Sequence, residues 1–344
     1  MDKKLSIIIS NRNDVVMLSI TVCSCLEELR PFGFAGEVVI VDNSDEQYLD
    51  QIKAALPSKY INEGKITLYH QPYPCLFSAR EKAAELAKGQ YILCLDSHML
   101  VGRDVFVDIV SFMDRHSDDP TLGFAHAPIN WAHHHESRAR HDRDMSVNEL
   151  GDWNKKYDYE RTITWKGMPW ICRRDWFLNR TDGLNGYGAL AEQRISWGGG
   201  DMHIGIKPWL LGFKNWAVPT NPCIHIGPYP KIDQGSTPGT TIVSKDPKSD
   251  YRYRRYSSSG NFPHTFGFLV SCYILGGESM MKRNEGILTE RFGKFIDVKK
   301  WWKKAITLGQ KERDWLLSKQ KMSFEELLTS QPWNKSVQKL NELK

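Results

Sequence analysis

The chain has 344 residues, of which 41% are hydrophobic and 25% are charged, and its formal net charge is +5. This composition excludes a wholly disordered chain, and the length suits one large α/β domain with a smaller appendage. No stretch reaches the roughly 20 apolar residues of a membrane-spanning helix, and the start lacks the apolar core of a signal peptide. We therefore expect a cytoplasmic protein without a membrane anchor, whose seven cysteines stay reduced.

The first hundred residues alternate between strand and helix patterns. Runs rich in β-branched residues predict strands at residues 5–10, 37–42, 65–69 and 91–95. Apolar residues at helical spacing predict helices at residues 15–29, 47–56 and 78–88, the last closed by Gly89. This alternation predicts an α/β fold, a mostly parallel twisted sheet with helices on both faces. Ligands bind beyond the carboxyl ends of such strands, where Asp42 and Asp96 lie.

The rest of the chain is less regular. Residues 102–130 predict one more helix and strand, and residues 131–166 lack periodicity and predict a long loop. A helix follows the glycines of residues 197–213 and is expected to break near Pro208. We expect a catalytic domain over residues 1–230. Residues 231–344 would then form an acceptor-side segment and a C-terminal helical unit.

Asp96-Ser97-His98 follows a predicted buried strand. Residues two apart in an extended segment project to the same side, so the carboxylate and the imidazole could approach one divalent cation. This pair of ligand types suits Mn²⁺ better than Mg²⁺. The alternative is that Asp96 only caps the following turn.

Two later segments carry further candidates. His225, in the apolar run Cys223–Gly227, is either a third metal ligand or a core histidine bonded to backbone. Asp201 follows three glycines that would let backbone approach a ligand, and an acid at a helix start is stabilised by the helix dipole. The alternative for Asp201 is a simple helix N-cap.

These three segments resemble a known family. LFSAREKAAELAKGQYILCLDSH (residues 76–98) resembles the helix–strand–DxH block of the polypeptide N-acetylgalactosaminyltransferases, relatives of glycosyltransferase family 2. WGGGDMHIGIKPWLLGF (197–213) is similar to their WGGE-containing block, and CIHIG (223–227) to the block with their last metal ligand. The resemblance implies a GT-A fold and a hexosyltransferase that uses a nucleotide-sugar donor, expected to be a UDP-sugar.

The resemblance also implies roles for individual residues. Asp96, His98 and His225 would bind the Mn²⁺ or Mg²⁺ ion that bridges the donor diphosphate. The remaining donor-site residues would be Asn11, Arg12 and Asp42 around the nucleoside, with Arg80 and Trp197.

The chain departs from the family at one position. Gly200 stands where the family has the glutamate of WGGE, and Asp201 follows it. Many inverting family 2 enzymes carry an acidic pair there, so Asp201 is a candidate catalytic base for the acceptor hydroxyl. The resemblance is to a retaining group and the local acid is typical of an inverting one, so both outcomes stay open.

Basic and aromatic residues alternate in several places, which suits base stacking and phosphate contact. They are Tyr251–Tyr256, Arg138–His141 and Lys299–Lys304. They suggest a hydroxymethylated base in DNA as the acceptor. The alternatives are solvated surfaces with tryptophan packed beneath, a protein or glycan acceptor, and a non-catalytic binding relative. A sugar-nucleotide-forming enzyme is disfavoured, because residues 10–14 lack the glycines of a phosphate loop.

Overall fold

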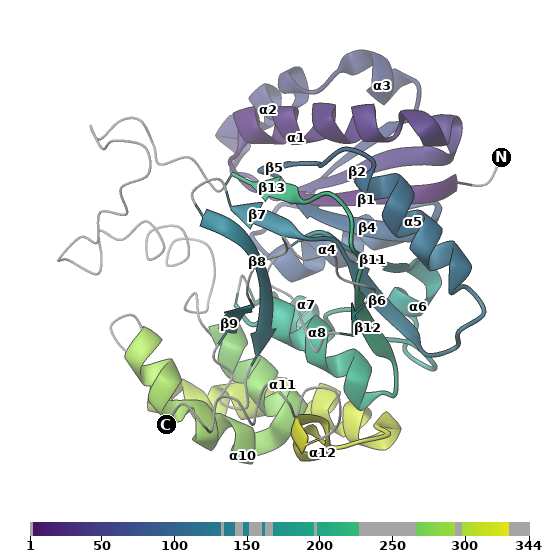
Figure 1. Cartoon of the computed structure of the whole chain (residues 1–344). Coiled ribbons are helices and arrows are strands. Elements are labelled where there is room, and N and C mark those ends of the chain that lie inside the picture. The colour runs from purple at the N-terminus through teal and green to yellow at the C-terminus, as the bar shows by residue number, and fades with distance from the viewer. Residues whose placement is uncertain are drawn as a thin grey trace.

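The structure is a computed structural model that describes residues 3–131, 134–141, 147–150, 160–161, 168–195, 198–226, 266–292 and 298–329. It has a large central sheet with helices on both faces, a smaller second sheet, and a layer of C-terminal helices (Figure 1). Among these residues, no helix combines the length and apolar character needed to cross a bilayer.

The central sheet has eight strands. In spatial order they are β10 (Glu160–Arg161), β12 (Lys214–Ala217), β6 (Leu122–His126), β11 (Trp170–Arg173), β4 (Gly89–Asp96), β1 (Lys3–Asn11), β2 (Gly36–Asp42) and β3 (Ile66–His70). The neighbours β4, β1, β2 and β3 are parallel, whereas β11 runs antiparallel between β4 and β6. The predicted α/β fold is therefore confirmed, with a mixed, mostly parallel sheet.

The strands with the strongest β-branched patterns form the core. Ile7, Ile8 and Ile9 of β1 are fully buried, and so are the valines and isoleucine of β2. Because both faces of a parallel sheet are covered by helices, such strands are apolar at every position rather than at every second one. Figure 1 shows α1 above this part of the sheet and α4 below it.

Short helices connect these strands. They are α1 (Val15–Glu28), η1 (Arg30–Ala35), η2 (Glu46–Tyr48), α2 (Leu49–Ala55), α3 (Ser58–Asn62), α4 (Leu76–Leu86), α5 (Val105–Arg115), α6 (Arg174–Leu178) and α7 (Ala189–Glu192). The predicted helices at 15–29, 47–56 and 78–88 are thus confirmed in kind, with shifted ends.

The second sheet corrects the expectation of a long loop. It contains β5 (Met99–Leu100), β13 (Cys223–His225), β7 (Ile129–Trp131), β8 (His134–His141) and β9 (Val147–Leu150). The loop prediction was wrong for β8 and β9, which pair antiparallel with each other. Pairing along a hairpin satisfies the backbone whatever the side chains are, so strands can form without an alternating apolar pattern.

Two local predictions were also wrong. Gly89 does not end α4 but begins β4, where a Cβ atom would lie only 2.6 Å from the backbone nitrogen of Ser6. Pro208 does not break α8 (Gly200–Leu210), because it lies near the end of the helix. Asn215 Nδ2 donates a buried hydrogen bond to the Gly205 carbonyl oxygen of the same helix at 2.6 Å.

The C-terminal helices pack against α7 and α8. They are α10 (Phe266–Phe292), which bends at Gly277, α11 (Val298–Lys319) and α12 (Phe324–Thr329). α10 and α12 contact α8, and α11 contacts α7. The expected helical extension is confirmed, although the sequence analysis missed α10. The division at residue 230 stays a prediction.

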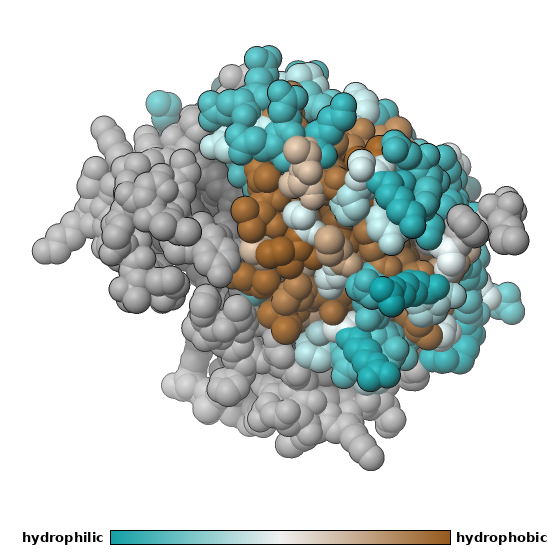
Figure 2. Space-filling model, turned by 90° about the horizontal axis from the view of Figure 1, so that it is seen from above, coloured by the Kyte–Doolittle hydropathy of each residue, from teal (hydrophilic) through white to brown (hydrophobic). Residues whose placement is uncertain are grey.

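All seven cysteines are free, and only Cys23 is exposed. Cys25, two residues further along α1, is buried. Figure 2 shows the face at the top of Figure 1, where apolar residues gather in the centre and hydrophilic residues lie around much of them. The exposed Val16 and Ile20 lie one turn apart on α1.

Candidate donor and metal site

Polar residues gather at the carboxyl ends of the parallel strands. The strand register places Asn11 beside Asp42, and Asp42 beside His70. In the other direction, Ser10 of β1 lies beside Asp96 of β4. Four neighbouring strands thus present their polar ends along one edge, the usual ligand-binding edge of such a sheet.

Asp42 is the centre of the first group. Its Oδ1 atom accepts hydrogen bonds from Asn11 Nδ2 at 2.9 Å and from Ser44 Oγ at 2.6 Å, and its Oδ2 atom lies 3.7 Å from His70 Nδ1. The Oδ1 atom of Asn11 is buried and has no hydrogen-bond partner among the residues that the structure describes. An unsatisfied buried acceptor is costly, so this position suits a donor group of a bound ligand.

Arg12 holds the neighbouring turn. Its guanidinium donates to the Asn43 carbonyl oxygen at 2.7 Å and to Asp45 Oδ1 at 3.0 Å. The structure therefore places Arg12 beside the predicted nucleoside site, with its guanidinium engaged by the turn that follows β2.

Asp96, His98 and His225 come together although His225 is distant in the sequence. One ligand atom from each lies within 4.8 Å of the others. His225 Nε2 lies 3.5 Å from Asp96 Oδ2. The imidazole rings of His98 and His225 lie edge to face, with their centroids 4.7 Å apart. All three side chains are at most 20% exposed.

Backbone pairing explains this convergence. β5 begins directly after His98 and pairs with β13, so that His225 lies opposite Met99. The Ile226 N–H also donates to the His98 carbonyl oxygen at 3.0 Å. From α1, Thr21 Oγ1 bonds both the Ser97 carbonyl and the Met99 N–H, which fixes the turn that carries His98.

Asp14 approaches the group from the start of α1. Its Oδ1 atom caps the helix by accepting from the Met17 N–H at 3.1 Å, and its Oδ2 atom lies 3.7 Å from His98 Nδ1. A carboxylate behind a ligating histidine commonly fixes the orientation of the ring. Sequence reasoning missed Asp14, whose only local signal is that of an ordinary N-cap.

Charge around Asp96 keeps it ionised. Burial raises the pKa of this carboxyl, but the contact with His225 and the Arg80 guanidinium outweigh burial and hold the pKa well below its usual range. Arg80 Nη2 donates to Asp96 Oδ1 at 2.8 Å, and the guanidinium is only 4% exposed. An ionised carboxylate is the form that a metal ion requires.

Tyr187 supports Arg80 from the other side. Arg80 Nη1 lies 3.1 Å from the Tyr187 hydroxyl oxygen, and the Tyr187 ring packs against Phe77 at 5.0 Å. The next residue on α4, Glu81, accepts hydrogen bonds from the N–H groups of Tyr187 at 2.5 Å and Gly188 at 3.1 Å. No local sequence pattern indicated a role for Tyr187 or Glu81, because the two residues contact each other although they are 106 positions apart in the sequence.

Asp201 lies in the first turn of α8, close enough to Arg80 and Tyr187 to influence them electrostatically. The N-cap alternative is excluded, since Gly199 is the N-cap. At Gly200, a Cβ atom would lie 2.5 Å from Phe77 Cε1. The buried Phe77 ring thus occupies the space that a larger side chain at position 200 would need.

Three predicted features lie outside what the structure describes, and a fourth lies on the surface. Trp197 and the Tyr251–Tyr256 cluster lie outside the described residues, as do the side chains of Arg138–His141. In Lys299–Lys304 the four lysines are exposed, whereas Trp301 and Trp302 pack partly buried against the core. This last cluster therefore matches the alternative of a solvated surface with tryptophan beneath.

A comparison with known proteins assigns the family. The sequence profile described as glycosyl transferase family 2 matches residues 6–184, slightly more than half of the chain. The chain belongs to glycosyl transferase family 2. The match runs from β1 through β11 and α6, and it includes Asn11, Asp42, Asp96 and His98.

The chain is similar to a putative polypeptide N-acetylgalactosaminyltransferase 13 of Drosophila melanogaster, with 24% identity over 251 residues, covering 66% of this chain and 42% of the relative. Among solved structures it is similar to GalNAc-T7, crystallised with UDP, GalNAc and Mn²⁺, at 17% identity and a TM-score of 0.65. That match covers 98% of this chain and 58% of GalNAc-T7, so this chain spans about half the length of these relatives. TarS of S. aureus (residues 1–349, with UDP-GlcNAc) matches with a TM-score of 0.47 and 13% identity, covering 91% and 83% of the two chains. The likeness to GalNAc-T7 confirms the GT-A fold.

The half-buried Glu81 gives this family 2 protein a pH-dependent stability. Burial raises the pKa of Glu81 from 4.5 to about 7, although the bound N–H groups and Lys207 lower it. Because the folded pKa exceeds the unfolded one, the folded state holds the proton more tightly. The resulting stabilisation is complete below pH 4.5 and is lost as the pH rises through 7.

Between pH 4.5 and pH 7, we expect the unfolding free energy of the wild type to fall by about 2–3 kcal/mol relative to that of Glu81→Gln. Urea unfolding at a series of pH values measures it. Glu85→Gln, at an exposed glutamate on the same helix, is the control and should follow the wild type. Parallel curves for Glu81→Gln and the wild type would contradict the assignment.

Proposed function

We propose that the protein is a metal-dependent glycosyltransferase that moves a sugar from a UDP-sugar to a hydroxyl acceptor. The observation that carries the proposal is the convergence of Asp96, His98 and His225 at the carboxyl edge of the sheet, beside the Asn11–Asp42 pair. Family membership supports the transfer of a sugar from a nucleotide donor. The UDP bound in the GalNAc-T7 structure supports the choice of nucleotide.

The three side chains fit a divalent cation. Their ligand atoms are mutually close, and Asp96 is held in its ionised form. One carboxylate with two imidazoles favours Mn²⁺ over Mg²⁺, in keeping with the Mn²⁺ of the GalNAc-T7 structure. When bound, the cation neutralises charge on the departing nucleoside diphosphate.

The residues of the chain would share the remaining work. Asn11 and Asp42 would bind the nucleoside through their paired side chains, with Arg12 holding the adjacent turn. Arg80 orients Asp96 and adds a fixed positive charge near the diphosphate. Asp201 would accept the proton of the acceptor hydroxyl as that oxygen attacks the anomeric carbon.

The acceptor class is a separate question. DNA as the acceptor stays a prediction, because most residues that suggested it lie outside the described part of the chain, and the described lysine cluster has an ordinary surface arrangement. The Drosophila relative is described as acting on polypeptides, so a protein acceptor is equally compatible with the comparisons. The cytoplasmic location likewise stays a prediction.

The proposal is tested by thermal unfolding of the protein with UDP-, GDP-, CMP- and dTDP-sugars, each with and without Mn²⁺. We expect a UDP-sugar to stabilise the wild type only when Mn²⁺ is present, by about 2.7 kcal/mol at 100 times its dissociation constant. Asp96→Asn should lose this effect. Asp114→Asn, which changes an aspartate that bonds Tyr91 near the opposite end of β4, should retain it.

Stabilisation by a different nucleotide class would overturn the assignment of the donor. If no nucleotide sugar stabilises the wild type, the transferase proposal fails and a non-catalytic binding role replaces it.

The role of Asp201 has its own test. We expect Asp201→Asn to lower kcat for UDP release from the UDP-sugar by about 10²–10⁴, because the general base is lost, while UDP binds as tightly as before. Asp175→Asn alters an exposed aspartate in the first turn of α6 and should leave kcat unchanged. An Asp201→Asn enzyme with normal kcat would exclude Asp201 as the base.

A further inference from the structure

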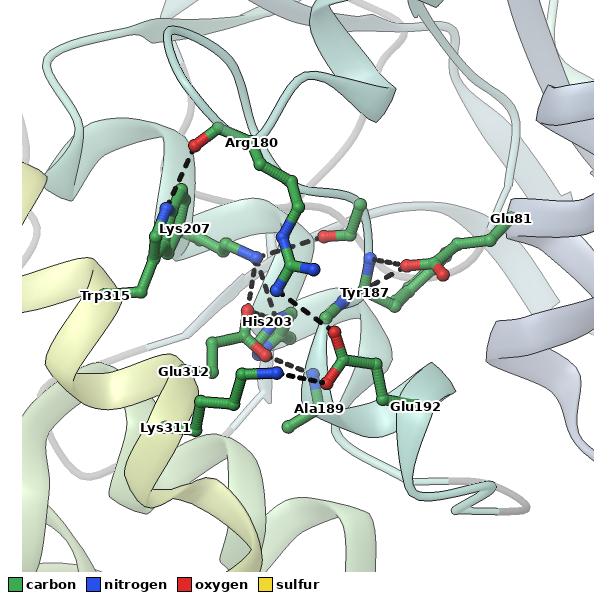
Figure 3. A network of polar contacts seen from close by, with 12 residues as sticks. Glu81, Arg180, Tyr187, Ala189, Glu192, His203, Lys207, Lys311, Glu312 and Trp315 are labelled. Carbon is green, nitrogen blue, oxygen red and sulfur yellow. Dashed lines mark hydrogen bonds and ion pairs between the residues drawn. The ribbon is translucent and has the colours of Figure 1, made fainter.

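A buried charged cluster joins the C-terminal helix α11 to α8. Glu312 of α11 bonds Lys207 Nζ at 2.5 Å and lies 3.3 Å from His203 Nε2, with both partners on α8 (Figure 3). Lys207 and His203 are completely buried, and the Glu312 side chain is 4% exposed. Replacing such a cluster with apolar side chains often costs no stability, so stability alone does not account for it.

The cluster forms hydrogen bonds with a short backbone segment, residues Gly186–Ala189, which we call the clamp segment. Lys207 Nζ donates to the Gly186 carbonyl oxygen at 3.1 Å, and Glu312 accepts from the Ala189 N–H. Glu81 holds the two residues between them through their N–H groups. Side chains from three helices therefore fix four consecutive residues (Figure 3).

The backbone of the clamp segment is shaped to receive these groups. Gly186 and Gly188 have φ values of 48° and 50°, a backbone conformation that residues with a side chain rarely adopt. A Cβ atom at Gly188 would overlap the Glu312 carboxylate, and one at Gly186 would lie 2.4 Å from Glu81 Oε1. The glycines thus let both carboxylates approach the backbone directly.

The clamp segment is connected to the metal group through Tyr187 and Arg80. Its Tyr187 hydroxyl contacts Arg80 Nη1, and Arg80 Nη2 bonds Asp96. A continuous chain of contacts therefore runs from Glu312 through the clamp segment, Tyr187 and Arg80 to Asp96. Every side chain along this chain, up to Arg80, is buried.

We propose that Glu312 is a positioning residue for the metal and donor site, acting through the clamp segment and the hydroxyl of Tyr187. This inference rests on the proposed function, since it assumes a cation at Asp96, His98 and His225. Glu312 never touches the cation. It fixes the position of Tyr187, whose hydroxyl fixes the position of the Arg80 guanidinium. The guanidinium in turn fixes the position of the Asp96 carboxylate.

The test measures the dissociation constant of Mn²⁺ by electron paramagnetic resonance of the free ion, well below the unfolding temperature. The proteins are the wild type, Glu312→Gln, Tyr187→Phe and the double variant. Glu312→Gln keeps the shape of the side chain but removes its charge, and Tyr187→Phe removes only a hydroxyl. We expect each single variant to weaken Mn²⁺ binding by about fivefold, a size typical of residues along a coupled network.

The double variant separates positioning from independent packing effects. If Glu312 acts through Tyr187, the double variant should bind Mn²⁺ no more weakly than the weaker single variant. Effects that multiply would overturn the inference. A lower unfolding temperature with an unchanged dissociation constant would also overturn it, because that is the result of a purely structural role.

Lys311→Met is the matched control. Lys311 precedes Glu312 on α11 and pairs with Glu192 of α7 at 3.7 Å, but its side chain is 79% exposed. This variant should bind Mn²⁺ as the wild type does. Normal Mn²⁺ binding in every variant would overturn the inference and leave the proposed function intact, whereas a wild type that binds no Mn²⁺ would overturn both.

Discussion

The carboxylate of Asp96 is the point on which the site depends. It ends a buried strand, and it contacts Arg80 from α4 and His225 from β13. Burying a carboxylate is costly unless positive charge and hydrogen bonds surround it. Two surrounding elements offset that cost. Helix α4 supplies the Arg80 guanidinium, and the pairing of β13 with β5 brings in the His225 imidazole. The same arrangement that makes an ionised Asp96 tolerable also prepares it to bind a cation.

The neighbouring features follow from the need to hold this edge of the sheet rigid. Asp14 and Thr21 of α1 fix the His98 turn, while Glu81, Lys207 and Glu312 fix the segment that carries Tyr187. Phe77 fills the space beside Gly200, so the first acid of α8 is Asp201. Groups that are held before the ligand arrives lose little entropy when it binds, which is the general advantage of a preorganised site.

The sequence predicted the parts of the fold whose signals are local. The buried strands carry apolar residues on both faces, and Asp42 and Asp96 lie at their carboxyl ends, the ligand-binding edge of a parallel sheet. The strands β8 and β9 and the helix α10 were missed, as their residues show no clear period. Asp14, His70, Tyr187 and Glu312 were missed for a different reason. Each acts through a contact distant in the sequence, and a single sequence does not reveal such contacts.

Pulsed electron paramagnetic resonance of Mn²⁺ bound to the protein with UDP tests most directly whether His98 and His225 bind the cation. We expect hyperfine coupling to imidazole nitrogen, together with coupling to diphosphate phosphorus. The nitrogen coupling should weaken in His225→Ala and vanish when His98 is also replaced. Coupling to phosphorus and water alone in the wild type would mean that the nucleotide holds the ion without the two histidines, and would contradict the central claim.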